Sequence, residues 1–242
     1  MPLQPIQRAY LDALGIEVWE QRTRAPAPAA PAVAANAPLA VAEPAPAGAR
    51  GPAAGGIETM DWEALEQAVA ACTRCELHKT RTRPVFGVGN RRADWLFVGE
   101  APGADEDRQG EPFVGRAGQL LNAMIEALGL RRADVYIANV LKSRPPGNRD
   151  PQPHEIAACE PYLVRQIALL RPRLIVALGR HAAHSLLKTD VPLARLRGQR
   201  LSYRGTPLVV TFHPAYLLRN PADKRRAWDD LCLARRIVEA GA

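Results

Sequence analysis

Four short apolar runs of strand length, separated by helical patterns, dominate this chain from residue 95 onward. The runs cover residues 95–98, 135–140, 174–178 and 208–212. Strands that alternate with helices in this way form parallel sheets with helices packed on both faces. The sequence therefore predicts an α/β fold, with a single three-layer domain whose central four-stranded parallel sheet is flanked by helices.

Helical patterns account for most of the sequence between these runs. Asp61 can cap a first helix, whose apolar face would carry Trp62, Leu65 and Val69. Gly129 follows the helical pattern at 116–128 and is a typical helix stop signal. The remaining expected helices cover 116–128, 153–170, 180–187 and 224–239. We therefore expect one folded domain over residues 57–242.

The segment before this domain has a very different composition. Residues 25–54 contain 15 Ala and 7 Pro. Proline removes backbone donors and alanine offers little surface to bury, so such a segment does not build a core. We expect residues 23–56 to be a disordered Ala/Pro-rich linker or tether.

Residues 1–22 form a short apolar segment at the far end of this tether. Tyr10, Leu11 and Leu14 share one face of a possible helix, which is typical of a docking segment. The alternative is that the segment packs on the folded domain. Leu14-Gly15-Ile16 and Trp19 resemble the N-terminal segment of the psi subunit of the bacterial clamp loader, which implies a replication or clamp-loader partner.

The net charge of +7 lies entirely in the expected domain, because residues 1–56 contain four basic and four acidic residues. A basic body favours a polyanionic partner, nucleic acid first, although ordinary solubility charge is the alternative. The sequence has no apolar run long enough to span a membrane, no signal peptide, and too few cysteines for a disulfide scaffold. We expect a cytoplasmic monomer with no membrane association.

Polar residues stand where three of the expected strands end. Glu100 follows the first strand, Asn139 ends the second and His213 follows the fourth. Ligands of open α/β sheets bind beyond the carboxyl ends of the strands. A carboxylate, an amide and an imidazole are therefore expected to converge on one site, although each residue alone is also common in a structural role.

A polar, glycine-rich loop at 99–121 joins the first strand to the next helix. It lacks the Gly-Lys-Ser/Thr ending of a phosphate loop, it is acidic, and its glycine spacing does not fit dinucleotide binding. Phe113 is an aromatic residue in this mostly polar loop. A planar ligand can stack on it, or the ring can fill the core.

Four blocks, in order, resemble the family 4 uracil-DNA glycosylases, iron–sulfur members of the uracil-DNA glycosylase superfamily. The resemblance covers about 70–235. The blocks are Cys72-Thr73-Arg74-Cys75, GEAPGADEDRQGEPFVGRAGQLL at 99–121, NVLKSRPPGNRDP at 139–151 and HPAYLLRNP at 213–221. The resemblance implies a monofunctional enzyme that flips uracil out of DNA and hydrolyses its N-glycosidic bond, leaving an abasic site.

The resemblance also implies a role for each site residue. Phe113 stacks on uracil, Asn139 reads its polar edge, Ala101 lines the pocket and His213 donates a hydrogen bond to O2. Glu100 matches the acidic residue of the family's motif, and Glu106 is the second candidate for orienting water. The better-known branch of the superfamily uses an Asp at the position of Ala101, so the choice of carboxylate stays open.

Contacts with DNA are implied for the blocks after Asn139 and His213. Leu217 or Leu218 fills the space left by the flipped base, or these leucines begin a packed helix. Positively charged and amide side chains contact the DNA backbone. The expected DNA-contacting residues are Arg149, Arg219 and Asn220, together with Lys142 and Arg144.

The cysteines are implied to bind a cluster. The family holds a 4Fe–4S cluster with four cysteines, and three of those positions match Cys72, Cys75 and Cys159. Ser143 stands at the fourth, and a serine hydroxyl is a poorer ligand than a thiolate. Three outcomes stay open: a 4Fe–4S cluster with Ser143 or water on one iron, a 3Fe–4S cluster, or no cluster. Cys232 is expected to be a core cysteine, and a substitute ligand is the alternative.

The sequence alone leaves two other functions as alternatives. One is a DNA-binding module that recognises uracil without turnover. The other is a replication-associated interaction protein that acts through residues 1–22. No lysine stands in the matching motifs as a Schiff-base nucleophile, which favours simple hydrolysis over strand cleavage. The sequence indicates nothing about bases other than uracil, or about single- against double-stranded substrate.

Overall fold

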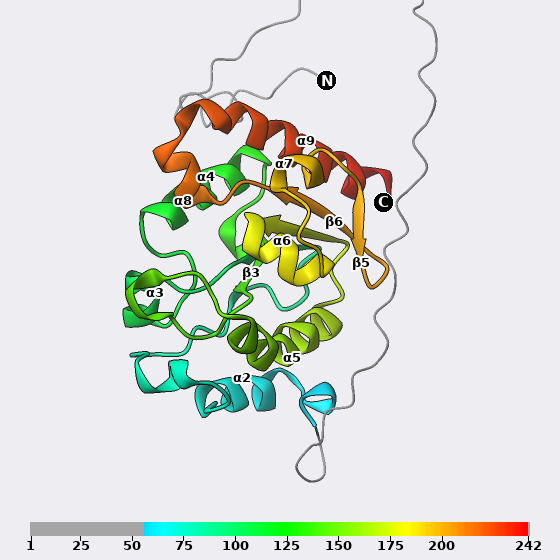
Figure 1. Cartoon of the computed structure of the whole chain (residues 1–242). Helices are drawn as coiled ribbons and strands as arrows, with labels where there is room; N and C mark the ends of the chain where they lie inside the picture. Colours follow the sequence, from blue (N-terminus) through cyan, green and yellow to red (C-terminus); the bar gives the residue numbers. More distant parts are fainter. Residues whose placement is uncertain (1–55, 242) are drawn as a thin grey trace, which may run out of the picture.

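A computed structural model describes residues 56–241. Its centre is one six-stranded sheet, with helices around it (Figure 1). The strand order is β1-β3-β2-β4-β6-β5. The bounds of the strands are β1 Val88–Gly89, β2 Trp95–Gly99, β3 Tyr136–Asn139, β4 Leu174–Leu178, β5 Leu201–Tyr203 and β6 Thr206–Thr211. The four inner strands run parallel, as the apolar runs predict.

The expected four-stranded parallel sheet is confirmed as the centre of a larger sheet, but the two edge strands were not expected. β1 pairs antiparallel with β3, and β5 pairs antiparallel with β6. Both edge strands are too short to give an apolar run in the sequence. β5 and β6 are joined by Arg204 and Gly205, both with positive φ, a turn that suits a tight hairpin.

Helices cover both faces of the sheet (Figure 1). On one face, α4, α8 and α9 pack against Trp95, Phe97 and Val176. On the other face, α5 and α6 pack against Leu96, Val98 and Ile175. β2 alternates between the two cores because successive strand side chains point to opposite faces. The bounds are α2 Trp62–Ala70, α3 Ala104–Gln109, α4 Arg116–Ala127, α5 Pro153–Leu170, α6 Arg180–Leu187, α7 Leu193–Leu196, α8 Pro214–Arg219 and α9 Lys224–Ala240.

The first helix packs outside this three-layer body. The Asp61 carboxylate accepts a hydrogen bond from the Ala64 N–H at 2.9 Å, so the expected N-cap of α2 is confirmed. Leu65 and Val69 of α2 bury themselves against Phe86 and Tyr162. This contact brings the loop after α2, with its two cysteines, next to α5.

Several expectations fall on residues outside the described part. The docking segment 1–22 and nearly all of the linker 23–56 lie there, so both stay predictions. Within residues 56–241, no helix is both long and apolar enough to cross a membrane. The cytoplasmic location and the monomeric state also stay predictions.

Candidate active site

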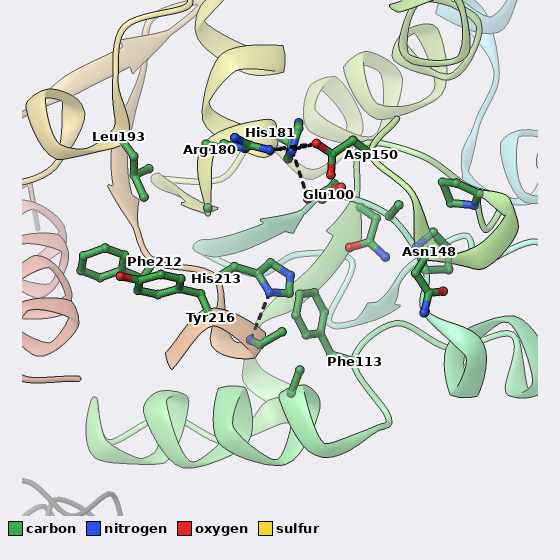
Figure 2. Close-up of a pocket in the computed structure, with 18 of the residues that line it drawn as sticks. Glu100, Phe113, Asn148, Asp150, Arg180, His181, Leu193, Phe212, His213 and Tyr216 are labelled. Atoms are coloured by element: carbon green, nitrogen blue, oxygen red, sulfur yellow. Dashed lines mark hydrogen bonds and ion pairs between the residues drawn. The ribbon is translucent and has the colours of Figure 1, made fainter. Parts of the chain in front are cut away.

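The carboxyl ends of the four parallel strands open into one cavity of about 860 Å³. Glu100, Asn139, Gly179 and His213, which end or follow β2, β3, β4 and β6, all line it. Phe113 enters from the loop between α3 and α4 (Figure 2). The structure therefore brings together the carboxylate, amide, imidazole and aromatic ring that the sequence places far apart.

Asn139 is the least exposed polar group of the cavity, with 2% of its surface accessible. Its Oδ1 atom has no hydrogen-bond partner within residues 56–241. Leaving a buried acceptor unpaired costs about 1–3 kcal/mol, a cost that a ligand donor would remove. Gly99 makes room for this amide, because a β-carbon there would overlap both Asn139 Oδ1 and the Phe113 ring.

Phe113 is held in a strained conformation beside the amide. Its φ is 55°, a left-handed value that non-glycine residues seldom adopt. Gly118 of α4 permits the fold here, since any β-carbon would collide with the Phe113 carbonyl. The ring belongs to the core cluster and also lines the cavity, so it fills the core as expected, and stacking on a planar ligand stays a prediction.

Glu106 organises this loop. Its Oε1 accepts hydrogen bonds from the backbone N–H groups of Val114 (3.0 Å) and Gly115 (3.1 Å), and its Oε2 accepts one from Gly103 (3.1 Å). Both carboxylate oxygens are thus engaged by main chain. This arrangement favours a structural role for Glu106 and leaves Glu100 as the available carboxylate.

His213 caps the N-terminus of α8. Its Nδ1 accepts a hydrogen bond from the Ala215 N–H at 3.1 Å, so the proton of the neutral ring lies on Nε2. Burial lowers the pKa of His213 to about 4, and the ring is therefore a neutral donor at physiological pH. Gly179, with φ of 87°, gives the imidazole space, since its β-carbon would come within 2.9 Å of His213 Cβ.

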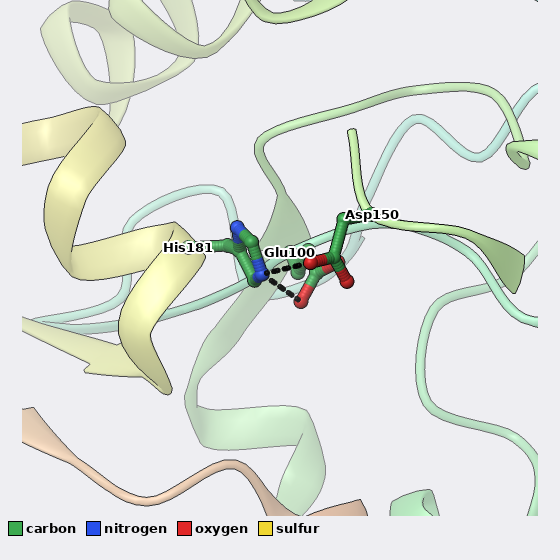
Figure 3. A group of neighbouring side chains, drawn as sticks. All are labelled: Glu100, Asp150 and His181. Atoms are coloured by element: carbon green, nitrogen blue, oxygen red, sulfur yellow. Dashed lines mark ion pairs between the residues drawn. The ribbon is translucent and has the colours of Figure 1, made fainter. Parts of the chain in front are cut away.

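Glu100 has a strongly perturbed pKa. Burial, and then the negative charge of Asp150, raise it to about 7, while Arg180 partly opposes the rise. Figure 3 shows Glu100, Asp150 and His181 side by side. His181 Nε2 lies 3.4 Å from Asp150 Oδ2 and 4.0 Å from Glu100 Oε2. A carboxylate with this pKa can exchange a proton near neutral pH.

Sequence reasoning missed Asp150, Arg180 and His181. Arg180 donates to Asp150 Oδ2 at 2.8 Å and to His181 Nε2 at 3.0 Å. The ligand atoms of Glu100, Asp150 and His181 lie close enough for a metal ion, but Arg180 already occupies two of them. One signal was available, because Arg180 and His181 directly follow the end of a predicted strand, as Glu100 does.

The two leucines that follow His213, Leu217 and Leu218, differ in how far they are buried. Leu217 is 1% exposed and packs in the core, whereas Leu218 is 36% exposed. The proposed insertion of Leu217 into DNA was therefore wrong, because α8 turns that side chain inward. Leu218, Arg219 and Asn220 are exposed, and Arg219 lines the cavity.

Two of the expected DNA-contacting cations have internal partners. Lys142 is buried, and its Nζ donates to the Asn139 carbonyl at 2.8 Å and to Gln166 Oε1 at 2.7 Å. It braces the end of β3, and its assignment to the DNA backbone was wrong. Arg149 is exposed and forms a bidentate ion pair with Glu155 (2.6 and 2.9 Å).

Arg144 also has a partner, since its Nε donates to Asn148 Oδ1 at 2.7 Å. Both Asn148 and Arg149 line the cavity. The 144–149 loop is therefore held in a fixed shape at the rim, and a DNA contact from it stays a prediction.

The three matching cysteines gather behind the cavity. Cys72 and Cys75 follow α2, and Cys159 projects from α5. A hydrogen bond between the Cys75 and Cys159 side chains lowers the pKa of the Cys75 thiol to about 6. Ala101 lines the cavity and packs in the same cluster as Cys75 and Cys159, whereas Cys72 packs beside Leu65 and Tyr162.

The donor set fits an iron–sulfur cluster at three positions, with three thiols and a buried Ser143 close by. Cys232 is not part of this group. It lies on α9, which packs on the opposite face of the sheet from α5, so a role as substitute ligand is excluded by its position.

Comparison with known proteins supports this arrangement of motifs. The family model described as the Uracil DNA glycosylase superfamily matches residues 86–232. The type-4 uracil-DNA glycosylase of Archaeoglobus fulgidus is 48% identical over 173 residues, which cover 68% of this chain and 86% of the relative. That of Thermotoga maritima is 46% identical over 166 residues, covering 68% and 86%. The type-5 uracil-DNA glycosylase of Thermus thermophilus is 33% identical over 160 residues, covering 53% and 73%.

Proposed function

The chain belongs to the type-4 uracil-DNA glycosylases and removes uracil from DNA, and we propose that it does so in the cavity of Glu100, Phe113, Asn139 and His213. The observation that carries this assignment is the unpaired, buried Oδ1 atom of Asn139, next to an aromatic ring and a neutral histidine. Such a site suits a flat, neutral base with its own donors and acceptors.

Recognition of uracil rests on Asn139 and Phe113. The amide Oδ1 accepts the N3–H of the flipped base, and Nδ2 donates to O4. Cytosine presents an amino donor and an unprotonated ring nitrogen at these places, so it would leave both groups of Asn139 unpaired. The Phe113 ring stacks on the face of the base, and its fixed position beside Gly99 keeps the stacking plane and the amide in register.

His213 stabilises the departing base. Breaking the N-glycosidic bond places negative charge on uracil and positive charge on the sugar. The Nε2–H of the neutral ring donates to O2 as this charge grows, because Nδ1 is already committed to Ala215. A preorganised donor of this kind typically contributes about 3–4 kcal/mol to the transition state.

Glu100 orients the attacking water. With a pKa of about 7, its carboxylate is largely ionised slightly above neutral pH, and the negative charge also offsets the oxocarbenium-like sugar. Glu106, the alternative, has both oxygens bound by main-chain N–H groups. No lysine lines the described part of the cavity, which supports hydrolysis that leaves an abasic site.

DNA is held at the rim of the cavity. The exposed Leu218 fills the gap that the everted base leaves in the stack, and Arg219 pairs with a phosphate. Both residues lie on α8, whose N-cap is His213. One short helix therefore carries the residues proposed to contact DNA and the residue proposed to stabilise the departing base.

Cys72, Cys75 and Cys159 would hold an iron–sulfur cluster, as thiolates suit iron. Its contribution when bound is structural, because the hydrolysis transfers no electron. Cys75 and Cys159 bring the loop after α2 next to α5, and they pack in the same cluster as Ala101 of the cavity wall. Uracil-containing DNA is the substrate, and a partner for residues 1–22 remains a separate prediction.

Single-turnover excision from a uracil-containing oligonucleotide, followed by alkali, tests the assignment. We expect Asn139→Ala and His213→Ala to lower the rate at least about tenfold, with unchanged circular dichroism. Asn122→Ala and His154→Ala, outside the cavity, are the matched controls. Wild-type rates for both site variants would overturn the assignment, and binding without alkali-labile product would support a module without turnover.

A further inference from the structure

We infer that Ser143 is the fourth protein ligand of the iron–sulfur cluster and that Arg81 positions it. The inference rests on the cluster proposed above. It concerns a position where this chain carries a hydroxyl group in place of a thiol, so the ligand set would be three sulfur atoms and one oxygen.

The guanidinium of Arg81 joins Ser143 to the first cysteine loop. Its Nη1 donates to Ser143 Oγ at 2.9 Å, and its Nη2 donates to the carbonyl oxygens of Cys72 at 2.9 Å and Ala70 at 3.2 Å. One planar group therefore fixes Ser143 against a segment far away in the sequence. Its positive charge also lies where a cluster with anionic ligands needs compensation.

The residue before Ser143 contacts Cys159, a second proposed ligand. The backbone N–H of its neighbour Lys142 points at Cys159 Sγ, 3.5 Å away. Cys159 in turn shares a hydrogen bond with Cys75. Arg81 therefore joins Ser143 to the backbone of Cys72, and Lys142, next to Ser143 in the chain, contacts Cys159. These contacts hold the three segments that carry the four proposed ligands against one another.

The hydroxyl group of Ser143 is buried, with 3% of the residue exposed. A serine oxygen has two lone pairs and one hydrogen. Arg81 uses one lone pair, and no acceptor for the hydroxyl hydrogen is found within residues 56–241. When iron binds, the Ser143 O–H bond breaks, its proton leaves to solvent and an Fe–O bond forms in its place, without any change in the number of electrons.

The test compares anaerobically purified wild type with Ser143→Ala, Ser143→Cys and, as control, the exposed Ser202→Ala. Iron and sulfide per chain, electron paramagnetic resonance and Mössbauer spectra are the readouts. We expect about four iron atoms per chain in the wild type, Ser143→Cys and the control. Mössbauer spectra should resolve one oxygen-ligated iron in the wild type that becomes sulfur-ligated in Ser143→Cys.

Ser143→Ala should lose about one iron atom per chain and show the resonance of a three-iron cluster. An unchanged iron count and unchanged Mössbauer spectrum in Ser143→Ala would overturn the inference while keeping the cluster. An iron-free wild-type protein that still excises uracil would overturn both the Ser143 inference and the proposed cluster. Arg81→Lys keeps the charge without the planar fork, and it should release iron to a chelator several-fold faster than the wild type does.

Discussion

The rings of Phe113 and His213 lie with their centroids 5.6 Å apart and their planes at 31° (Figure 2). One ring comes from the loop before α4 and the other from the N-cap of α8. Each is fixed by its own neighbours, Phe113 by a glycine of α4 and His213 by the Ala215 N–H. The two groups that would stack on uracil and stabilise its departure are therefore in place before DNA binds, which limits reorganisation during the reaction.

Gly99→Ala should damage the site with little effect on the sheet. The new β-carbon would overlap Asn139 Oδ1 and the Phe113 ring, so one of them has to leave its position. We expect kcat/KM on uracil-containing DNA to fall about 100-fold, as displacements of about 1 Å can do. The backbone of Gly99 needs no left-handed conformation, so the strand itself tolerates alanine.

Gly56→Ala is the control for this variant, because the β-carbon there meets only the flexible end of Glu58. Thermal unfolding of Gly99→Ala should stay within a few degrees of the wild type. A variant with wild-type kcat/KM would show that the close approach of Asn139 and Phe113 is not needed.

The rate of excision should fall as the pH drops through 7. The pKa of Glu100 is raised to about 7, so below this pH its carboxylate takes up a proton and no longer orients water. Asp150→Asn removes the negative charge that, after burial, raises this pKa, and it should move the acidic limb of the pH–rate profile to lower pH. His213, with a pKa of about 4, stays neutral near pH 7, so its titration does not contribute to the fall in rate around that pH.

The measurement is the single-turnover rate from pH 5 to pH 9, an interval that spans the acidic limb. Arg180→Gln removes the opposing positive charge and should move the limb to higher pH. The exposed Asp229→Asn on α9 is the control. Identical profiles for wild type, Asp150→Asn and Arg180→Gln would contradict the role of Glu100.

Leu217 and Leu218 should respond in opposite ways to alanine substitution. Leu217→Ala opens a cavity in the core and should lower the free energy of unfolding by about 2–5 kcal/mol. Leu218→Ala should leave stability unchanged and lower excision from double-stranded DNA several-fold more than from single strands, since only a duplex has a gap to fill. Equal losses on both substrates would contradict the insertion of Leu218.

Arg219→Ala should weaken DNA binding equally for all sequences. Each phosphate contact contributes about 0.9 to the slope of log K against log salt, so the variant should have a slope smaller by about that amount. Arg149→Ala should also lower stability, because Arg149 pairs with the buried Glu155. An unchanged salt slope in Arg219→Ala would exclude a phosphate contact.

The sequence was most informative where elements are long and apolar. β4, α5 and α6 have the bounds that the sequence predicts, because buried runs and helical periodicity are strong signals. The edge strands β1 and β5 were missed because two or three residues carry no such pattern. Antiparallel pairing at an edge depends on a turn such as Arg204-Gly205, whose effect a search for apolar runs does not detect.

The site was predictable at the strand ends and unpredictable beyond them. Glu100, Asn139 and His213 converge because parallel strands share one carboxyl edge. The inward direction of Leu217 and the burial of Lys142 depend on packing against distant helices. The contact of Asp150 with Glu100 depends on how the loop after β3 folds back, which local sequence does not specify.

The place of the flipped base can be seen in a crystal structure of the protein with DNA that carries a non-hydrolysable deoxyuridine analogue. We expect uracil everted onto the Phe113 ring, with its N3–H donating to Asn139 Oδ1 and its O2 accepting from His213 Nε2–H. Uracil bound elsewhere, or an everted base that leaves Asn139 Oδ1 unpaired, would contradict it.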